Sequence, residues 1–305
     1  MITIYDHTNS PIWAETYKTR FAAYQKTNGA YTYSQEIVKY HIPIIKEILN
    51  QYNSNLNTVI MSVGESYNLP SIQNKNLIIQ YLHEKFERDW LRVEKSIKLP
   101  VKHIFITGRI NVQRELEKRG IACIWLPMSI DKNYILQHSH INEKRYENRI
   151  IYFGNRYLGK GLTFDVLRNF FLARQIAFDS ISNNVYTRYD GDNIKITRDN
   201  IMQVLSNYKY GIGNGRCALE MFALGIKVVI SGARIGGIIM NAEDFNKHSL
   251  NNFAADNDDF TFSNNILECW NSIDKSITKT TDITDILQIL KDKLKIMLDK
   301  LQIVC

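Results

Sequence analysis

The sequence predicts an α/β protein with two domains, each built on a parallel β-sheet. Strand-sized apolar runs alternate with amphipathic helical stretches from the beginning of the chain almost to its end, which is the pattern of parallel-sheet architecture. A polar stretch without periodicity interrupts this alternation near the middle of the chain. The chain has 305 residues, of which 45% are hydrophobic and 23% are charged, so it is long enough and apolar enough for two separate cores.

Residues 1–136 form the first predicted domain. Its apolar runs at 2–5, 58–63, 77–82, 103–107 and 122–126 have the length of strands, and helices lie between them. The clearest helix covers residues 34–50, where apolar side chains recur at steps of three and four from Ile37 to Leu49. Ser34 provides an N-cap for this helix.

Residues 137–149 are polar and charged and form the predicted linker. The second predicted domain, residues 150–280, opens with an apolar strand at 150–153. Further strands are predicted at 176–181 and 227–231, and helices at 163–173, 198–207 and 216–224.

The last segment, residues 281–305, is predicted to be an amphipathic helix. Leu290, Leu294, Met297 and Leu301 recur at steps of three and four, and lysines occupy other positions. Such a stripe packs against the protein core or lies on an anionic membrane surface. We favour packing, because the apolar stripe of a helix usually faces the core.

The composition restricts the location and the partners of the protein. No apolar run approaches the roughly 20 residues that span a bilayer, and the N-terminus does not resemble a signal peptide, so we expect a cytoplasmic protein without a transmembrane segment. The four cysteines lack the spacing of a metal site, so we expect reduced thiols and no metal. The net charge of +7 favours an anionic partner such as a nucleotide, a nucleic acid or a membrane surface.

Residues 152–162 contain the first candidate site. Gly154 follows the opening strand of the second domain, and a glycine there lets the backbone approach a ligand closely. Arg156 and Lys160 follow it and can neutralise a diphosphate. The pattern indicates a phosphate site, with an exposed basic loop as the alternative interpretation.

Residues 211–225 contain the second candidate site. Glycines at 211, 213 and 215 precede a predicted helix, and the N–H groups of a helix's first turn bind phosphate together with the helix dipole. Glu220 lies one turn into that helix. The run is not G-x-G-x-x-G, and Glu220 is too near to be the ribose-binding acid expected roughly 20 residues further on, so we reject a nicotinamide-dependent dehydrogenase.

Three segments resemble the motifs of one known family, and they occur in that family's order. Residues 126–131 (LPMSID) resemble the segment P-x-G-V-D, residues 154–161 (GNRYLGKG) the loop G-R-x-x-x-x-K-G, and residues 214–230 the helix and strand G-x-x-x-L-E-A-x-A-x-G-x-P-V-I. The chain is thereby similar to the GT-B glycosyltransferases of the group 1, family 4-like type, which have a C-terminal donor domain. The resemblance implies two Rossmann-like domains that face a central cleft. It also implies transfer of a sugar from a nucleotide diphosphate sugar, UDP-sugar above all, to a hydroxyl without a required metal or other cofactor.

The same resemblance implies roles for individual residues. Lys160 and Arg156 would contact the donor diphosphate, and Glu220 would accept hydrogen bonds from the ribose hydroxyls. Gly236 and Gly237 would line the donor sugar, or form an ordinary turn. The complete set for the nucleotide and its phosphates, in which backbone amides around residues 213–215 hold phosphate, is Gly154, Asn155, Arg156, Lys160, Gly213, Asn214, Gly215, Arg216 and Glu220.

Two departures from the family pattern leave the stereochemistry of transfer open. Ile212 stands where many retaining members have a glutamate, eight residues before the position of Glu220. Asn155, rather than an arginine, directly follows Gly154. Both inverting and retaining transfer therefore stay compatible with the sequence.

An inverting enzyme needs a carboxylate or a histidine that removes the proton of the acceptor hydroxyl. Side chains that follow the strands of the first domain are the candidates, because ligands of parallel sheets bind at strand carboxyl ends. We name Asp6, His83 and Glu84 as catalytic candidates, and His7 and Glu65 occupy similar positions. In a retaining enzyme the leaving phosphate can take the proton instead. Residues 190–192 (DGD) have the spacing of a metal-binding D-x-D motif, but we interpret them as a turn.

The acceptor is a hydroxyl of a modified DNA base, a glycan, a lipid or a protein, and the basic charge favours DNA. Residues 11–33 combine aromatic and basic side chains, as surfaces that bind nucleic acid do, or form an ordinary helix and loop over the first sheet. Two other functions stay open: a sugar-nucleotide epimerase of the same fold, and a non-catalytic nucleic-acid-binding protein. Release of free nucleotide together with a glycosylated product would distinguish the transferase from both.

Overall fold

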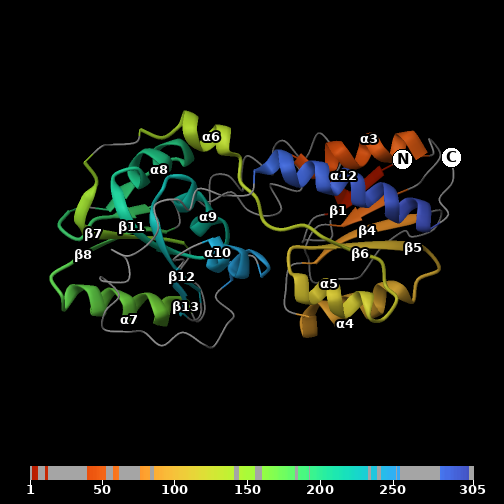
Figure 1. The fold of residues 1–305 in the computed structure, drawn as a ribbon, viewed down its shortest axis with the longest axis horizontal. Coiled ribbons are helices and arrows are strands. Elements are labelled where there is room, and N and C mark those ends of the chain that lie inside the picture. Colours follow the sequence, from red (N-terminus) through yellow and green to blue (C-terminus); the bar gives the residue numbers. More distant parts are fainter. Residues whose placement is uncertain are drawn as a thin grey trace. The chain divides into compact units, whose positions relative to one another are not determined.

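The computed structural model (Figure 1) describes residues 2–5, 11–12, 40–52, 58–61, 76–82, 86–140, 144–154, 160–182, 185–191, 193–232, 235–238, 242–251, 253–254 and 282–301. They belong to two α/β units, and the chain passes from the first to the second after Pro127. Unit 1 contains the elements before that point together with the last helix, which begins at Ile283. Unit 2 contains the elements from Met128 to Asp282, so the predicted linker at 137–149 lies within it.

The sheet of unit 1 is parallel except for one short strand at its edge. The strands β1, β3, β4, β5 and β6 run parallel in sequence order, and β2 pairs antiparallel with β1. Their bounds are β1 (Ile2–Tyr5), β2 (Pro11–Ile12), β3 (Thr58–Met61), β4 (Leu77–Leu82), β5 (Lys102–Thr107) and β6 (Cys123–Trp125). The five parallel strands lie where the apolar runs of the sequence predict them, because runs of this length are buried on both faces of a parallel sheet.

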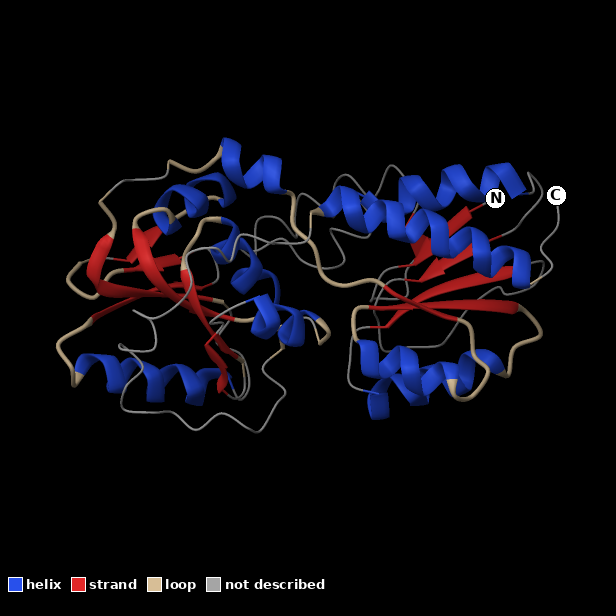
Figure 2. Cartoon of the chain, in the orientation of Figure 1, coloured by secondary structure: helices blue, strands red, loops and turns tan. Residues whose placement is uncertain are grey.

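Helices cover both faces of this sheet (Figure 2). One face carries α3 (Ile42–Tyr52) and α12 (Ile283–Lys300), and the other carries α4 (Phe86–Ile97) and α5 (Ile110–Glu117). Successive side chains of a strand point to opposite faces. Ile104 and Ile106 of β5 accordingly pack with α3 and α12, whereas Phe105 packs with α4 and α5.

The C-terminal helix α12 packs its apolar stripe on unit 1, as favoured from the sequence. Ile286, Leu290, Leu294 and Leu298 are fully buried in a core shared with α3. The Lys293 ammonium donates to the Trp125 carbonyl at 3.2 Å, which ties the helix to the end of β6. No helix among the described residues has both the length and the apolar character to cross a membrane.

The sheet of unit 2 has a parallel centre and antiparallel edges. Its order is β10-β9-β8-β7-β11-β12-β13, in which β8, β7, β11 and β12 are parallel neighbours. The edge strands β9, β10 and β13 pair antiparallel. Their bounds are β7 (Tyr146–Phe153), β8 (Ala177–Ser182), β9 (Val185–Thr187), β10 (Asn193–Lys195), β11 (Tyr208–Gly213), β12 (Lys227–Ser231) and β13 (Ile235–Ile238).

Helices also cover both faces of the second sheet (Figures 1 and 2). The helix α7 (Lys160–Leu172) packs on one face against Tyr152, and α8 (Arg198–Leu205) and α9 (Gly215–Ala223) pack on the other face against Phe153. Two shorter helices, α6 (Lys132–Gln137) and α10 (Ala242–Ser249), complete the unit. We refer to the two sides of the sheet as the α7 face and the α9 face.

The central strand β11 is the main element that the sequence analysis missed, because its glycines were interpreted as the residues that open the following helix. Both glycines lie where a helix passes close to the strand. A Cβ at Gly211 would lie 2.5 Å from the Met221 Sδ atom, and a Cβ at Gly213 would lie 2.8 Å from both the Met221 Cε atom and the Phe153 carbonyl oxygen. The glycines therefore allow α9 to pack closely on β11.

The strand β7 begins at Tyr146, four residues before the predicted start at 150. The first half of β7 is polar and mostly exposed, which is why its sequence predicted a linker. It is nevertheless paired, since Tyr146 donates its N–H to the Asn207 carbonyl at 2.8 Å. The preceding residue, Arg145, donates to the Leu224 carbonyl at 2.7 Å and so caps the C-terminal end of α9.

Candidate functional site

Both candidate segments of the sequence lie at the carboxyl edge of the second sheet. The strand β7 pairs in parallel with β11, and Phe153 at the end of the first is the register partner of Gly213 at the end of the second. The segments that follow, beginning with Gly154 and Asn214, are therefore neighbours at one edge, about 4.8 Å apart in strand spacing.

This point is also where the topology of the sheet reverses. From β7 the chain enters α7 and continues to β8 on one side of β7, whereas from β11 it enters α9 and continues to β12 on the other side. The two helices cover opposite faces. Ligands of open α/β sheets bind in the crevice outside the carboxyl ends of the strands at such a switch point. We call this edge, from Gly154 and Lys160 to Asn214 and Glu220, the switch-point site.

The first segment contributes a glycine and a cation. Gly154 is buried, and its N–H donates to the Ile181 carbonyl of β8 at 3.1 Å. Lys160 is the first residue of α7 and is half-buried. One turn later Phe164 packs edge-on against Tyr152 of β7, with ring centroids 4.8 Å apart, which holds the start of α7 over the sheet edge. Asn155 and Arg156 lie outside the described residues.

The second segment contributes an N-cap, a buried cation and a buried carboxylate. Asn214 is the N-cap of α9 with extended backbone dihedrals, and its side chain makes no capping hydrogen bond. Arg216 is 8% exposed and Glu220 is 1% exposed. The N–H of Gly215 donates to the Phe253 carbonyl at 2.9 Å. This amide, expected from the resemblance to hold phosphate, therefore has an internal acceptor.

Gly236 and Gly237 form neither the expected turn nor a loop, because both lie in β13. Gly237 is the register partner of Ile230, and the register then moves by one extra residue, Gly236, before Ile235 pairs with Ser231. This is a β-bulge, a feature common at sheet edges and beside active sites. The two glycines lie in a strand because β13 supplies hydrogen-bond partners for β12, which would otherwise be an open edge.

The sequence analysis named three catalytic candidates in the first domain. Asp6, His83 and Glu84 lie outside the described residues, as do His7, Glu65 and most of the aromatic and basic segment 11–33. The resemblance at residues 126–131 includes Asp131, whose carboxylate accepts from the Tyr134 N–H at 2.9 Å and caps α6. Asp131 thus has a structural role.

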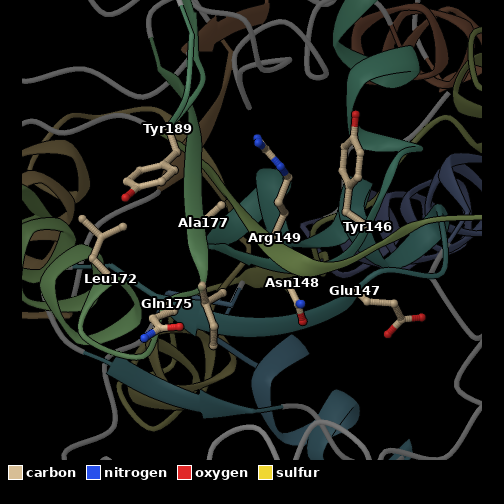
Figure 3. Close-up of a pocket in the computed structure, with 9 residues that line it drawn as sticks. Tyr146, Glu147, Asn148, Arg149, Leu172, Gln175, Ala177 and Tyr189 are labelled. Atoms are coloured by element: carbon tan, nitrogen blue, oxygen red, sulfur yellow. The ribbon is translucent and has the colours of Figure 1, made fainter.

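A pocket of about 390 Å³ lies at the opposite, amino edge of the second sheet (Figure 3). It is lined by Tyr146, Glu147, Asn148, Arg149, Leu172, Gln175, Ile176, Ala177 and Tyr189. In Figure 3 the Arg149 side chain lies between the rings of Tyr146 and Tyr189. Its guanidinium carbon is 5.5 Å from the centre of the Tyr146 ring, at cation–π distance.

The charge of Arg149 is neutralised by carboxylates of the protein itself. Arg149 donates to both carboxylate oxygens of the buried Asp179 and also pairs with Asp190. Burial lowers the pKa of Arg149, but the hydrogen bonds to the two carboxylates outweigh it, so the net pKa is raised. Asp190 lies in the turn after β9, as the interpretation of residues 190–192 expected, and its ion pairs lower its pKa. Arg149, the cation of this pocket, therefore has a structural role, and the switch-point site remains the candidate functional site.

Two features of the described residues bear on cofactors. The described residues contain no group of three or more His, Cys, Asp and Glu side chains that could hold a metal ion. The thiols of Cys123 and Cys217 are buried and form no disulfide, and burial raises the pKa of Cys123 well above the ordinary value. Neither thiol has the character of a reactive nucleophile.

The sequence matches no protein-family model and no curated protein significantly. The residues of the switch-point site and their geometry therefore carry the functional argument.

Proposed function

We propose that the chain is a glycosyltransferase that binds a nucleotide diphosphate sugar, UDP-sugar above all, at the switch-point site. The observation that supports this most directly is the pairing of Phe153 with Gly213. It brings two segments that are about sixty residues apart in sequence to neighbouring strand ends, at the location where open parallel sheets bind nucleotides. Each segment was selected from its sequence alone as a phosphate or nucleotide site.

The proposal assigns the phosphate contacts to side chains. Lys160 begins α7 at the carboxyl edge, and Arg216 lies in the first turn of α9 at the same edge. Two cations there would neutralise the donor diphosphate and stabilise the charge that develops on it as the sugar leaves. The Gly215 amide is not included, since it donates to the Phe253 carbonyl.

Glu220 is proposed to accept hydrogen bonds from the ribose hydroxyls. Its side chain lies on α9, one turn beyond Arg216, and is almost completely buried. A carboxylate accepts hydrogen bonds at two oxygens, and a pair of vicinal hydroxyls can donate two.

The acceptor is proposed to be a hydroxyl bound by unit 1 in a GT-B arrangement of the two units. The basic net charge of +7 supports a polyanion such as DNA with hydroxylated bases. The general base, if the enzyme inverts configuration, is proposed among Asp6, His83 and Glu84. A leaving phosphate that takes the proton would replace it in a retaining enzyme.

Thermal unfolding in the presence of UDP, GDP, ADP and their sugar conjugates tests the donor site. We expect one diphosphate series to raise the unfolding temperature by mass action, and Lys160→Ala to reduce that shift. Glu147→Gln, at the opposite edge of the sheet, is the matched control and should leave it unchanged. The absence of a shift with every nucleoside diphosphate would refute the proposal.

Product analysis then separates the transferase from its alternatives. Incubation with the stabilising sugar nucleotide and duplex DNA containing hydroxymethylated bases should release nucleoside diphosphate and give glycosylated DNA. An epimerase would convert the sugar nucleotide without any acceptor. A non-catalytic nucleic-acid-binding protein would bind DNA, with log affinity falling linearly against log salt, and would release nothing.

A further inference from the structure

The carboxyl edge of the second sheet contains buried hydroxyl groups that no part of the described structure satisfies. Ser231 ends β12, is 2% exposed, and its Oγ has no hydrogen-bond partner among the described residues. Ser182 ends β8, and its Oγ is also buried without a hydrogen-bond partner among the described residues. Most buried polar groups in native proteins are hydrogen-bonded, and a buried hydroxyl without a partner is destabilising. Such a group at a ligand-binding edge indicates a partner that arrives with the ligand.

Strand alternation places both hydroxyls on the α7 face. In β12, Val228 and Ile230 pack in the core with α9, whereas Val229 packs in the core with α7. Ser231 therefore follows Val229 onto the α7 face. The bulge beside it does not change this side, because the extra residue, Gly236, belongs to β13 and leaves the alternation of β12 intact.

Ser231 lies beside the switch point, on the strand next to β11. Ile230 is the register partner of Gly213, so Ser231 lies one strand, about 4.8 Å, from the end of β11. Gly154 lies at the end of β7, the next strand. Lys160 begins α7 on this same face and at this same edge. A cation and a hydroxyl donor thus share one face, while Glu220 belongs to the helix on the other.

We propose that the Ser231 hydroxyl donates a hydrogen bond to the terminal phosphate of the bound nucleoside diphosphate, an inference that rests on the proposed donor site. The ligand would cross the carboxyl edge of the sheet. Its nucleoside end lies on the α9 face at Glu220, and its diphosphate reaches the α7 face at Lys160 and Ser231. Phosphate, rather than the sugar, is the partner because the serine shares its face with a cation and a phosphate oxygen only accepts hydrogen bonds.

The substitution Ser231→Ala tests this through two measurements, the affinity for the nucleotide and the unfolding temperature of the free protein. A purely structural role of Ser231 would leave the affinity unchanged and would lower the unfolding temperature. The affinity for UDP and for UDP-sugar should fall by about tenfold or more, since a hydrogen bond to a charged acceptor is lost. The affinity for UMP, which lacks the terminal phosphate, should not change. The unfolding temperature without ligand should be unchanged or higher, because a buried hydroxyl without a partner is removed.

Ser206→Ala is the matched control. Ser206 is fully buried in the same unit, and its Oγ donates to the Met202 carbonyl at 2.7 Å. The control should lower the unfolding temperature and leave the affinity for UDP unchanged. The crossed pattern of the two variants would be specific to a ligand-binding hydroxyl at Ser231.

Three outcomes overturn the assignment of Ser231: unchanged UDP affinity in Ser231→Ala, equal losses for UDP and UMP, or a loss confined to UDP-sugar. A lower unfolding temperature with unchanged UDP affinity would show instead that Ser231 stabilises the fold. The proposed function fails separately, if the wild-type chain binds no nucleoside diphosphate at all. If another base is preferred over uridine, its diphosphate and monophosphate replace UDP and UMP.

Discussion

Arg149 donates from Nη1 to both carboxylate oxygens of Asp179, at 2.9 Å to Oδ2 and 3.2 Å to Oδ1. The Asp179 side chain is completely buried, whereas that of Arg149 is 17% exposed. Two further donors complete the carboxylate: the Tyr208 hydroxyl at 2.5 Å and the Tyr189 N–H at 2.7 Å. The Tyr186 hydroxyl extends the network at 2.6 Å from that of Tyr208.

This network links β7, β8, β9 and β11 on the α9 face, near the amino edge of the sheet. Burial, with the hydrogen bond to Asp179, raises the pKa of Tyr208 far above its ordinary value, so the phenol is protonated and donates at neutral pH. The charge of Asp179 is balanced internally by Arg149. The network therefore aligns the strands that present the switch-point site at the opposite edge.

Asp179→Asn should destabilise unit 2 by about 3–5 kcal/mol, because it removes the charge that pairs with Arg149 and replaces one of the two acceptor oxygens with an NH2 donor. The loss in the free energy of unfolding is measured from the urea-induced unfolding transition of unit 2. Asp190→Asn removes the exposed partner of the same arginine and should have only a small effect. Equal losses in the two variants would contradict the central role of the buried carboxylate.

Gly211→Ala should destabilise unit 2 by about 1–3 kcal/mol through overpacking against Met221. The nearest atom is the sulfur of a flexible side chain, 2.5 Å from the added Cβ, so Met221→Ala should partly rescue this variant. Gly213→Ala should not be rescued in the same way, because its Cβ also lies 2.8 Å from the Phe153 carbonyl oxygen of the backbone.

Gly191→Ala is the control for both glycine variants, since its Cβ makes contacts no shorter than 3.5 Å. Denaturant midpoints of the single and double variants provide the comparison. A rescue of Gly213→Ala equal to that of Gly211→Ala would show that backbone contact does not limit the packing of α9 on β11.

Glu220→Gln should weaken nucleoside diphosphate binding by about 1.5–3 kcal/mol, the range for hydrogen bonds to a charged group, and leave the fold intact. Titration calorimetry with UDP measures the change, and circular dichroism checks the fold. Glu147→Gln, an exposed position at the amino edge of β7, is the matched control. Unchanged affinity in a folded Glu220→Gln variant would assign the buried carboxylate a purely structural role.

The stability of unit 1 should decrease on acidification because of His41. This side chain is completely buried, its Nδ1 lies 3.1 Å from the Tyr81 hydroxyl, and burial lowers its pKa to about 3 from 6.5. The unfolded chain binds a proton below about pH 6.5 while the folded chain stays neutral, so stability is complete above that pH and falls as the pH decreases towards 3. At pH 5 the loss from His41 alone is about 2 kcal/mol.

The measurement is urea unfolding at pH 7.5 and pH 5 in the wild type and in His41→Leu. The variant should lose about 2 kcal/mol less than the wild type between the two pH values. Burial also lowers the pKa of His103 in the same unit, so the variant should retain part of the pH dependence. The exposed His140 provides the control as His140→Gln, which should follow the wild type. Identical pH dependence in His41→Leu and the wild type would contradict this account.

The sequence by itself determined the fold class and most of the elements. Apolar runs are a local signal, so β4 and β12 were predicted at the bounds that the structure has, and the start of α8 at Arg198 was also correct. Local chemistry also selected Gly154 and Lys160 as candidates, because glycines and cations after a strand indicate phosphate binding whatever the fold, whereas the role of Glu220 came from the resemblance to a family.

Local patterns failed where packing between distant segments decides the structure. The glycines of β11 were interpreted as the residues that open a helix, but they lie in a strand and accommodate the helix that crosses it at Met221. The polar start of β7 predicted a linker, but it is held by pairing with the segment after α8. Gly236 and Gly237 predicted a turn, but they lie in a bulged edge strand.

Tertiary structure alone decided how the candidate residues combine. The sequence contains both candidate phosphate-binding segments, but only the parallel pairing of β7 with β11 makes them neighbours at a topological switch point. Ser231 and Asp179 gave no usable sequence signal, because a buried hydroxyl without a partner and a carboxylate that accepts four hydrogen bonds from three donors are both defined by groups from other segments of the chain. Hydrophobic periodicity is a pattern over a few neighbouring residues, whereas the hydrogen-bond partners of a buried polar group come from other strands of the sheet. The arrangement of the candidate site depends on these distant partners.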